Sequence, residues 1–253
     1  MRLLLTNDDG INAKGIYALA KELEKNHELI IAAPDSERSA SSHSITIRKT
    51  LFVKQVQLEG LKSKAYSLSG TPADCVKFAV DKFADEKIDM VLSGINNGLN
   101  VGMDVLYSGT VSAAIEAASN NVPSMAVSLE VKNGIEGDYE VAAEYAAKVL
   151  EKVKYKFLKN NVVLNLNIPF LPPEKIKGIK VCRIGGRSFC GYFTEVDSQG
   201  EDRGFKLQSK VNDLHDDDTD VYFIKQGYAA LTPLHYDFTN FKLLEEANKI
   251  FNK

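Results

Sequence analysis

The chain has 253 residues, of which 44% are hydrophobic and 26% charged, and its formal net charge is -3. This composition is typical of a soluble globular protein, and the length suits one large α/β domain. A chain without a basic excess is a poor partner for a nucleic-acid polymer. Its apolar runs fall short of the ~18 residues of a membrane span, and its N-terminus does not resemble a signal peptide. We therefore expect a cytoplasmic protein that binds neither nucleic-acid polymers nor membranes.

The cysteines agree with this location. Cys75, Cys182 and Cys190 are an odd number and show no metal-ligand spacing. Cys182 and Cys190 could meet across a hairpin, but we expect reduced, inert thiols, as is usual in cytoplasmic proteins.

The start of the chain predicts a parallel sheet covered by helices. An apolar run at residues 3–5 ends in the polar loop 6–10, which is typical of a buried strand followed by a loop. Apolar residues recur at helical spacing over 15–23, and a second apolar run at 29–33 predicts the next strand. A strand, a helix and a strand in this order begin a parallel sheet.

The sequence between residues 45 and 166 predicts further strands and helices. Alternating residues at 45–48 and 51–53 predict a β-excursion outside the main sheet. Thr71 can cap a helix that opens with Pro72, and Asp74 stands where a capping-box acid would. We expect this helix to reach residue 82, strands at 88–92, 124–127 and 162–166, a polar turn at 93–98, and helices at 111–119 and 141–153.

The residue composition changes after residue 180. Glycines separate short segments that carry several aromatic residues, so we expect 185–222 to form hairpins or an extended arm. A strand at 228–231 and a helix at 243–251 should complete the fold. No linker or internal repeat divides the chain. We therefore treat residues 1–253 as a single α/β domain with 185–222 as a protruding β-arm.

The pair Asp8-Asp9 lies where ligands gather in a wound parallel sheet, beyond the carboxyl end of a strand. Adjacent carboxylates repel each other, and a cation that neutralises both would relieve this repulsion. Oxygen ligands without histidine or cysteine suit Mg²⁺, Mn²⁺ or Ca²⁺ rather than zinc. The alternative is a simple Asp-Asp-Gly turn in which one carboxylate caps the next helix.

Three other polar segments follow predicted strands or precede a helix. The loop 35–44 holds five serines with Arg38 and His43, and it could equally be a solvated loop. The asparagine-rich loop 93–100 offers amide oxygens or plain turn chemistry. Ser108-Gly109-Thr110 opens a predicted helix, where free N–H groups form a phosphate cradle, although N-capping by Thr110 explains it equally well.

Six segments of the sequence, spread over nearly the whole chain from residue 3 to residue 235, form one recognisable set. They are Leu4 to Gly10, Ala33 to Ser39, Gly70 to Val76, Ser93 to Gly98, Asp104 to Val111 and Leu231 to His235. In this order and spacing they resemble the SurE family of survival-protein nucleotidases.

This resemblance implies a three-layer α/β/α sandwich with a Rossmann-like parallel sheet and a C-terminal β-hairpin arm that is exchanged in a homodimer or homotetramer. It implies hydrolysis of nucleoside 5′-monophosphates, also of 3′-monophosphates, and in some members of short polyphosphate. It implies one divalent cation per subunit, Mg²⁺ or Mn²⁺ with Ca²⁺ as a further candidate, at the positions matching Asp8, Asp9, Ser39 and Asn96.

From these ligands we derive a hypothesis for the chemistry. Asp8, Asp9 and Asn96 form the catalytic centre, and the ion that they hold would polarise a phosphoryl oxygen and orient a water for in-line attack. The phosphate would be bound by Ser108, Gly109 and Thr110 with Asn96 and Asn100 close by. His43 could protonate the leaving group, or it could be a loop histidine without a role.

Two other classes of protein remain open. A haloacid dehalogenase-type phosphatase needs a second aspartate two positions after the first, but Gly10 and Ile11 stand two positions after Asp8 and Asp9. A Rossmann-type binding module should show a Gly-x-Gly-x-x-Gly turn after the first strand. Gly10 and Gly15 are the only glycines among residues 7–15, so this motif is absent.

Overall fold

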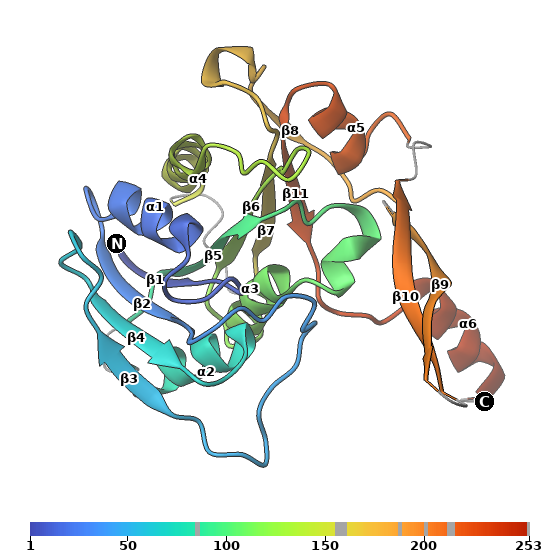
Figure 1. Ribbon diagram of the computed structural model, residues 1–253, viewed down its shortest axis with the longest axis horizontal. Coiled ribbons are helices and arrows are strands. Elements are labelled where there is room, and N and C mark those ends of the chain that lie inside the picture. The colour runs from blue at the N-terminus through green and yellow to red at the C-terminus, as the bar shows by residue number, and fades with distance from the viewer. Residues whose placement is uncertain (84–86, 155–160, 187–188, 200–201, 212–215, 252–253) are drawn as a thin grey trace.

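The computed structural model describes residues 1–83, 87–154, 161–186, 189–199, 202–211 and 216–251. Within this part of the chain, nine strands form one sheet in the order β3-β4-β2-β1-β5-β6-β7-β11-β8 (Figure 1). Its strands are β1 (Arg2–Thr6), β2 (Glu28–Pro34), β3 (Val53–Val56), β4 (Lys64–Leu68), β5 (Met90–Asn97), β6 (Ser124–Leu129), β7 (Val163–Ile168), β8 (Ile179–Val181) and β11 (Ala229–Leu234).

The central strand β1 shows why the molecule has three layers. Leu3, Leu4 and Leu5 are fully buried, and β1 runs parallel to both β2 and β5. Successive side chains of a strand point to opposite faces. Leu3 and Leu5 therefore join the core beneath α1 (Lys14–Leu23) and α4 (Tyr139–Val153), whereas Leu4 joins the core beneath α2 (Pro72–Lys82) and α3 (Gly109–Ser119). The predicted α/β/α sandwich is confirmed.

The helix α2 begins as its sequence predicts. The side chain of Thr71 accepts a hydrogen bond from the backbone N–H of Asp74, and Asp74 accepts one from the backbone N–H of Thr71. The helix α3 begins at Gly109 rather than at the predicted residue 111, and its N-cap is Ser108, so the alternative of capping by Thr110 is wrong. The Ser108 hydroxyl accepts a hydrogen bond from Val111 N–H at 3.0 Å, which leaves the hydroxyl of Thr110 for another partner.

Two sequence predictions were wrong. Residues 45–48 form no strand, since Ile45 and Ile47 are exposed and the loop is held instead by Thr46, which donates two hydrogen bonds to Asp74. The strand β3 begins later and pairs with β4 at the edge of the main sheet, so there is no excursion. The expected turn at 93–98 belongs largely to β5, because β6 continues to pair with β5 beyond a register shift.

The C-terminal third contains a separate antiparallel hairpin, β9 (Phe189–Gln199) with β10 (Asp202–Val211), which confirms the predicted arm. In Figure 1 this hairpin and α6 (Phe241–Phe251) stand at the edge of the molecule, away from the main sheet. No residue of α6 is buried. The sequence did not predict α5 (Asp220–Lys225), which begins inside the range expected for the arm. Among the described helices, none combines the length and the apolar character that crossing a membrane requires.

Candidate functional site

The turn after β1 fixes Asp8 and Asp9 at the end of the central strand. The Asn7 side chain donates to the Gly10 carbonyl at 2.9 Å and accepts from the Gly10 N–H at 3.2 Å. Gly10 has a φ of +101°, a conformation that favours glycine. The following helix α1 has Ala13 as its N-cap and receives no side-chain capping bond. Neither aspartate therefore serves as a helix cap.

Both carboxylates are held in a setting that disfavours their charge. Asp8 is only 4% exposed, and burial raises its pKa, although hydrogen bonds from the Thr110 hydroxyl and backbone lower it in part. Burial, followed by the charge of Asp8, raises the pKa of Asp9 to about 6. Asp9 accepts a hydrogen bond from Asn97 N–H at 3.2 Å. A cation would relieve the electrostatic repulsion between the two carboxylates.

The N-terminus of α3 lies directly against Asp8. A Cβ atom at Gly109 would stand 2.8 Å from Cβ of Asp8 and 2.9 Å from both Asp8 Oδ2 and Ser41 Oγ. Such distances leave no room for a side chain, so this approach requires glycine. The predicted carboxylate pair and the predicted phosphate cradle are therefore neighbours.

The serine loop, which we define as residues 35–44, passes over the same place. Its Arg38 N–H donates to the backbone carbonyl of Asp8 at 2.7 Å. The Ser39 hydroxyl is exposed and donates to Glu37 Oε1 at 2.6 Å. After larger contributions from burial, the charge of Glu37 also raises the pKa of both Asp8 and Asp9. Sequence reasoning did not single out Glu37, because an isolated glutamate in a polar loop carries no signal.

Asn96 arrives at the site on the end of β5. Its Nδ2 donates to the Gly98 carbonyl at 2.8 Å, a bond that does not use its Oδ1. The next residue, Asn97, donates its N–H to Asp9, so this end of β5 adjoins the aspartate pair. The close packing depends on Gly15 of α1, where a Cβ would lie 2.0 Å from the Ile95 carbonyl oxygen.

Two predicted residues use their side chains elsewhere. Asn100 is buried, and its Nδ2 donates to Ser128 Oγ at 2.9 Å. His43 lies 2.8 Å from Glu116 through its Nε2. Glu116 is about 10 Å along the α3 axis from Gly109, since each helical residue advances the axis by about 1.5 Å. The structure thus brings Asp8, Asp9, Asn96, Ser39 and the Ser108–Thr110 cradle to one edge of the sheet, but it commits Asn100 and His43 to other partners.

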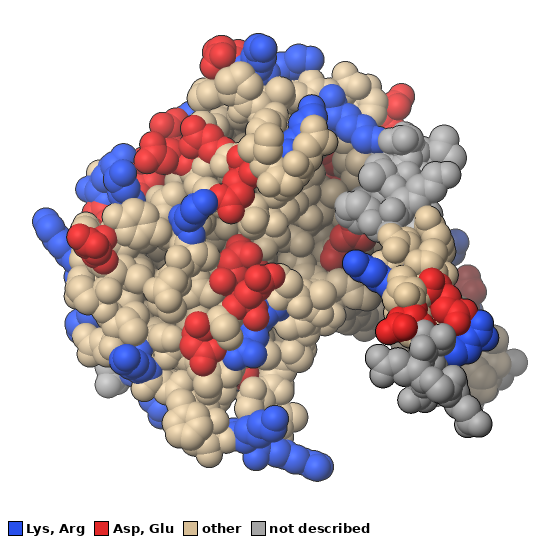
Figure 2. Space-filling model, in the orientation of Figure 1, with Lys and Arg blue, Asp and Glu red and all other residues tan. Residues whose placement is uncertain are grey.

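The residues at this edge fit a hard divalent cation. The donors are two carboxylates, a hydroxyl and an amide oxygen, which is the ligand chemistry of Mg²⁺, Mn²⁺ and Ca²⁺. Ser41 Oγ is buried beside Asp8 and has no hydrogen-bond partner in the described part of the chain. Among the described residues, no three His, Cys, Asp or Glu side chains are grouped so that they could hold a metal. In Figure 2, acidic side chains gather near the middle of the viewed face.

The sequence profile described as Survival protein SurE matches residues 3–190. This chain belongs to the SurE family. A protein of Clostridium tetani named 5′-nucleotidase SurE is 53% identical over 99% of this chain and 100% of its own length. A second protein of that name, from Clostridium kluyveri, is 55% identical and aligns over the full length of both chains. The crystal structure of the SurE protein from Aquifex aeolicus is 33% identical and covers 99% of both chains with a TM-score of 0.86.

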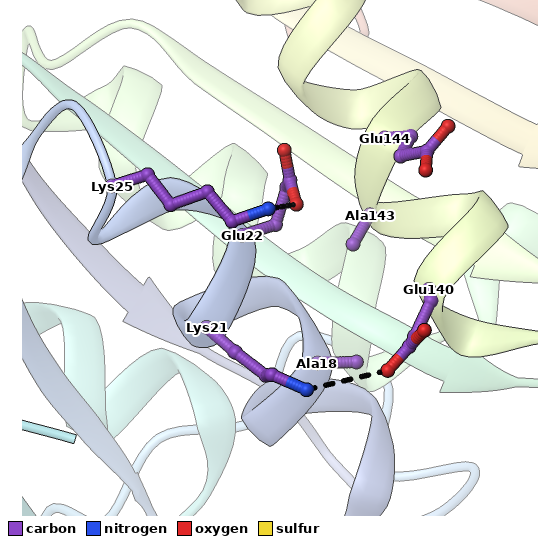
Figure 3. A pocket seen from close by; sticks show the side chains of 7 residues that line it. All are labelled: Ala18, Lys21, Glu22, Lys25, Glu140, Ala143 and Glu144. Carbon is purple, nitrogen blue, oxygen red and sulfur yellow. Dashed lines mark hydrogen bonds and ion pairs between the residues drawn. The ribbon is translucent and has the colours of Figure 1, made fainter. Parts of the chain in front are cut away.

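A surface depression lies between α1 and α4, away from the site described above (Figure 3). Its charged side chains are already paired, with Lys21 3.4 Å from Glu140 and Lys25 2.5 Å from Glu22. Lys21, Lys25 and Glu140 are exposed, Glu22 is partly buried, and the members of each pair neutralise one another. Ion pairs near the surface contribute little to binding or stability. We assign no function to this depression.

Proposed function

We propose that this SurE-family chain is a metal-dependent phosphatase that hydrolyses nucleoside 5′-monophosphates to nucleoside and phosphate. One observation carries the proposal: Asp8, the first residue of the carboxylate pair, is in contact with the N-terminus of α3 through Gly109. A cation site and an anion site side by side suit a phosphate ester. The relatives named 5′-nucleotidase SurE, at 53% and 55% identity over nearly complete chains, support the substrate class.

In this proposal Asp8, Asp9, Ser39 and Asn96 hold one divalent ion per subunit, either Mg²⁺ or Mn²⁺ with Ca²⁺ as a third candidate. When bound, the ion supplies charge neutralisation and Lewis-acid activation of the phosphoryl group. The chain itself positions the reactants. The first turn of α3 presents N–H groups and the positive end of the helix dipole to the phosphate oxygens, and Ser108 fixes that turn by capping it.

The remaining roles follow from where each side chain is held. Thr110 orients Asp8 through its hydroxyl and is thereby tied to the carboxylate pair. Asn100 supports the segment before the cradle, since its carbonyl accepts hydrogen bonds from Asn165 and Asn167 at 2.8 and 3.1 Å. His43 is engaged by Glu116, so we propose no proton transfer by His43. Phosphoryl transfer depends mostly on positioning and on charge neutralisation, and a protein nucleophile is not required.

We extend the proposal to 3′-monophosphates and short polyphosphate, which the family resemblance implies, and to a cytoplasmic location. The thiols support that location in part: Cys75 and Cys182 are free, and burial raises the pKa of both, so they are poorly reactive. Side-chain contacts of Cys190 lie outside the described residues.

We also propose that residues 1–253 form one domain whose arm, within 185–222, joins subunits into a homodimer or homotetramer. Phe193 stands opposite Leu207 in the hairpin, and both are more than half exposed. Phe241 and Phe251 of α6 are likewise exposed. Large apolar side chains are usually covered when they form a contiguous surface. A second copy of this chain is the partner that we expect, and sedimentation of the full-length protein tests it.

The decisive test is phosphate release from a panel of nucleoside 5′- and 3′-monophosphates by the full-length protein with Mg²⁺, Mn²⁺ or Ca²⁺. We expect turnover that stops on complete chelation and returns when the ion is restored. Activity that survives complete chelation would overturn the metal mechanism. A trapped phospho-aspartate would favour a haloacid dehalogenase-type reaction, and tight nucleotide binding without turnover would favour a binding module.

A further inference from the structure

The serine loop has a backbone that needs external support. Ala40 and Ser42 have φ values of +54° and +50°, a conformation that residues other than glycine rarely adopt. They flank Ser41, whose hydroxyl is buried against Gly109 without a partner among the described residues. Such a conformation costs free energy and persists only where surrounding contacts impose it. The contacts that anchor this loop therefore decide where its hydroxyl groups lie.

The loop has anchors on both sides of Ser41. On the near side, Arg38 N–H donates to the Asp8 carbonyl at 2.7 Å. Next to Ser41, Ser42 N–H donates to the Tyr107 carbonyl at 3.1 Å. On the far side the anchor is a side-chain pair, His43 with Glu116 at 2.8 Å. The near anchor is part of the ion site itself, whereas the far anchor reaches α3 two helical turns below the cradle.

Glu116 is the fixed member of that pair. It is only 7% exposed, whereas the side chain of His43 is 37% exposed. The other carboxylate oxygen of Glu116 accepts from Asn120 Nδ2 at 2.9 Å and lies 3.4 Å from Lys77 Nζ. Its hydrogen bond with His43 is the main reason that the pKa of Glu116 lies below its ordinary value. A buried, ionised carboxylate held from three sides determines where the more exposed histidine rests.

We propose that Glu116 is a positioning residue for the ion site, and that it acts through His43 to fix the serine loop with Ser39 and Ser41 beside Asp8 and Asp9. The inference rests on the proposed function in taking Asp8, Asp9, Ser39 and Asn96 as the ion site. Glu116 itself lies too far along α3 to touch the phosphate. The role proposed for Glu116 is to hold the serine loop, with its unfavourable backbone conformation, against the Ser108–Thr110 cradle. Partners behind the direct ligands of a metal commonly change its affinity by about 10- to 100-fold when they are removed.

The test is the variant Glu116→Ala, studied with Mn²⁺ alone and without nucleotide. We expect the dissociation constant for Mn²⁺, measured by electron paramagnetic resonance, to rise about 10- to 100-fold. We expect hydrogen exchange at the Ser42 amide to speed up, while the Arg38 amide on the near side stays protected. At saturating Mn²⁺, kcat for nucleotide hydrolysis should fall much less than the Mn²⁺ affinity does.

Matched variants separate positioning from general damage. Glu116→Gln keeps an oxygen for His43 and should recover part of the affinity. His43→Ala should reproduce the effect of Glu116→Ala, and the double variant should show little further loss, because the two residues act in series. Should Glu116→Ala fail to fold, His43→Ala replaces it in every measurement. Glu140→Ala removes an exposed helix glutamate from its pair with Lys21 (Figure 3) and should leave Mn²⁺ binding unchanged.

The proposal stands only if both readouts change together. An unchanged Mn²⁺ constant with faster exchange would reduce Glu116 to a structural role and overturn the proposal. A weaker Mn²⁺ site with unchanged exchange at Ser42 would also overturn it, because Glu116 would then not act through the loop. Failure of the proposed function would give a different result, because the wild-type protein would then bind Mn²⁺ without hydrolysing nucleotides. The differences in Mn²⁺ affinity and in hydrogen exchange between wild type and Glu116→Ala would still test the role of Glu116.

Discussion

Gly109 and Asp8 touch, and the contact is possible because Gly109 has no side chain. A Cβ atom there would stand 2.8 Å from Cβ of Asp8, closer than Cβ atoms come to non-bonded neighbours in proteins. The contact joins the end of β1 to the start of α3, two segments far apart in the sequence. It is this junction that sets a pair of carboxylates beside a helix N-terminus.

Gly109→Ala should therefore damage the site more than the fold. The added methyl group must displace Asp8, Ser41 or the first turn of α3, and overpacking of this kind costs about 1–3 kcal/mol. A displacement of about 1 Å at a reacting centre can lower the rate about 100-fold. We expect a loss of kcat/KM of that order, with a modest fall in the free energy of unfolding measured in urea. Gly186→Ala, where a Cβ meets nothing within 4 Å, is the control and should behave as wild type.

The hydroxyl of Thr110 can be tested by Thr110→Val, which keeps the shape of the side chain. The variant leaves the buried Asp8 without one donor, which should destabilise the protein by about 1–3 kcal/mol. The Thr110 hydrogen bond lowers the pKa of Asp8, so its loss raises that pKa. The acidic limb of the activity profile should then move to higher pH, because Asp8 is needed in its ionised form. Thr110→Ser keeps the hydroxyl, and an equal shift in that variant would contradict the explanation.

Much of the fold could be predicted where a local pattern determines the element. The apolar run of β1 and the Thr71–Asp74 capping box are complete within a few residues. The helix α5 escaped prediction because its six residues include bulky aromatic and β-branched side chains, which have modest helix propensity. It forms because Thr219 caps it and because it packs against β11 and β7. Such tertiary support leaves no periodic signal.

The candidate site likewise has residues whose positions a local pattern predicts and residues whose positions depend on tertiary contacts. The position of Asp8 and Asp9 could be predicted, because a buried parallel strand followed by polar residues is a local pattern that places them at the end of β1. The pairing of His43 with Glu116 could not, since it joins residues 73 positions apart and depends on how α3 is laid against the serine loop. Glu37 could not be predicted for the same reason. Its charge acts on Asp8 and Asp9 only because the folded chain places the serine loop over Asp8.

The raised pKa of Asp9 makes a prediction about the stability of the metal-free protein. The folded-state pKa of about 6 lies above the ordinary value of 3.8, so this group stabilises the fold at low pH and that contribution is lost as the pH rises through about 6. Each pKa unit corresponds to about 1.4 kcal/mol, and partial exposure reduces the total to about 1–2 kcal/mol. Asp9→Asn should therefore be more stable than wild type at pH 8 in excess chelator, although it hydrolyses no nucleotide.

Urea unfolding of wild type and Asp9→Asn at pH 8 and at pH 4.5 or so measures this directly, since the advantage of the variant should shrink at the lower pH. Added Mn²⁺ should reverse the order at pH 8, because an ion that binds only the folded wild type stabilises it by mass action. Asp9→Ala and Asp8→Ala should likewise lose turnover and keep the fold. A variant Asp9→Asn that is less stable than wild type at pH 8 without metal would contradict the electrostatic account.

The buried carboxylate of Asp220 ties the base of the arm to the segment that leads into the cradle. Its Oδ1 accepts from the Gly185 and Val221 N–H groups at 2.9 and 2.8 Å, and its Oδ2 accepts from Gly102 N–H at 2.8 Å. Asp220→Asn replaces one acceptor by an NH₂ group that must face a backbone donor. Hydrogen bonds to charged groups contribute about 1.5–3 kcal/mol each, so we expect a loss of about that size in the free energy of unfolding.

Because Gly102 begins the short helix Gly102–Leu106, which runs into Ser108, Asp220→Asn should also raise KM for the nucleotide. Urea unfolding and steady-state kinetics on the same preparation measure the two effects. Asp218→Asn is the matched control, since it breaks only the exposed pair with Arg183 and such pairs contribute little. If Asp220→Asn loses stability but keeps the wild-type KM, the arm base and the cradle are independent, and the carboxylate serves the fold alone.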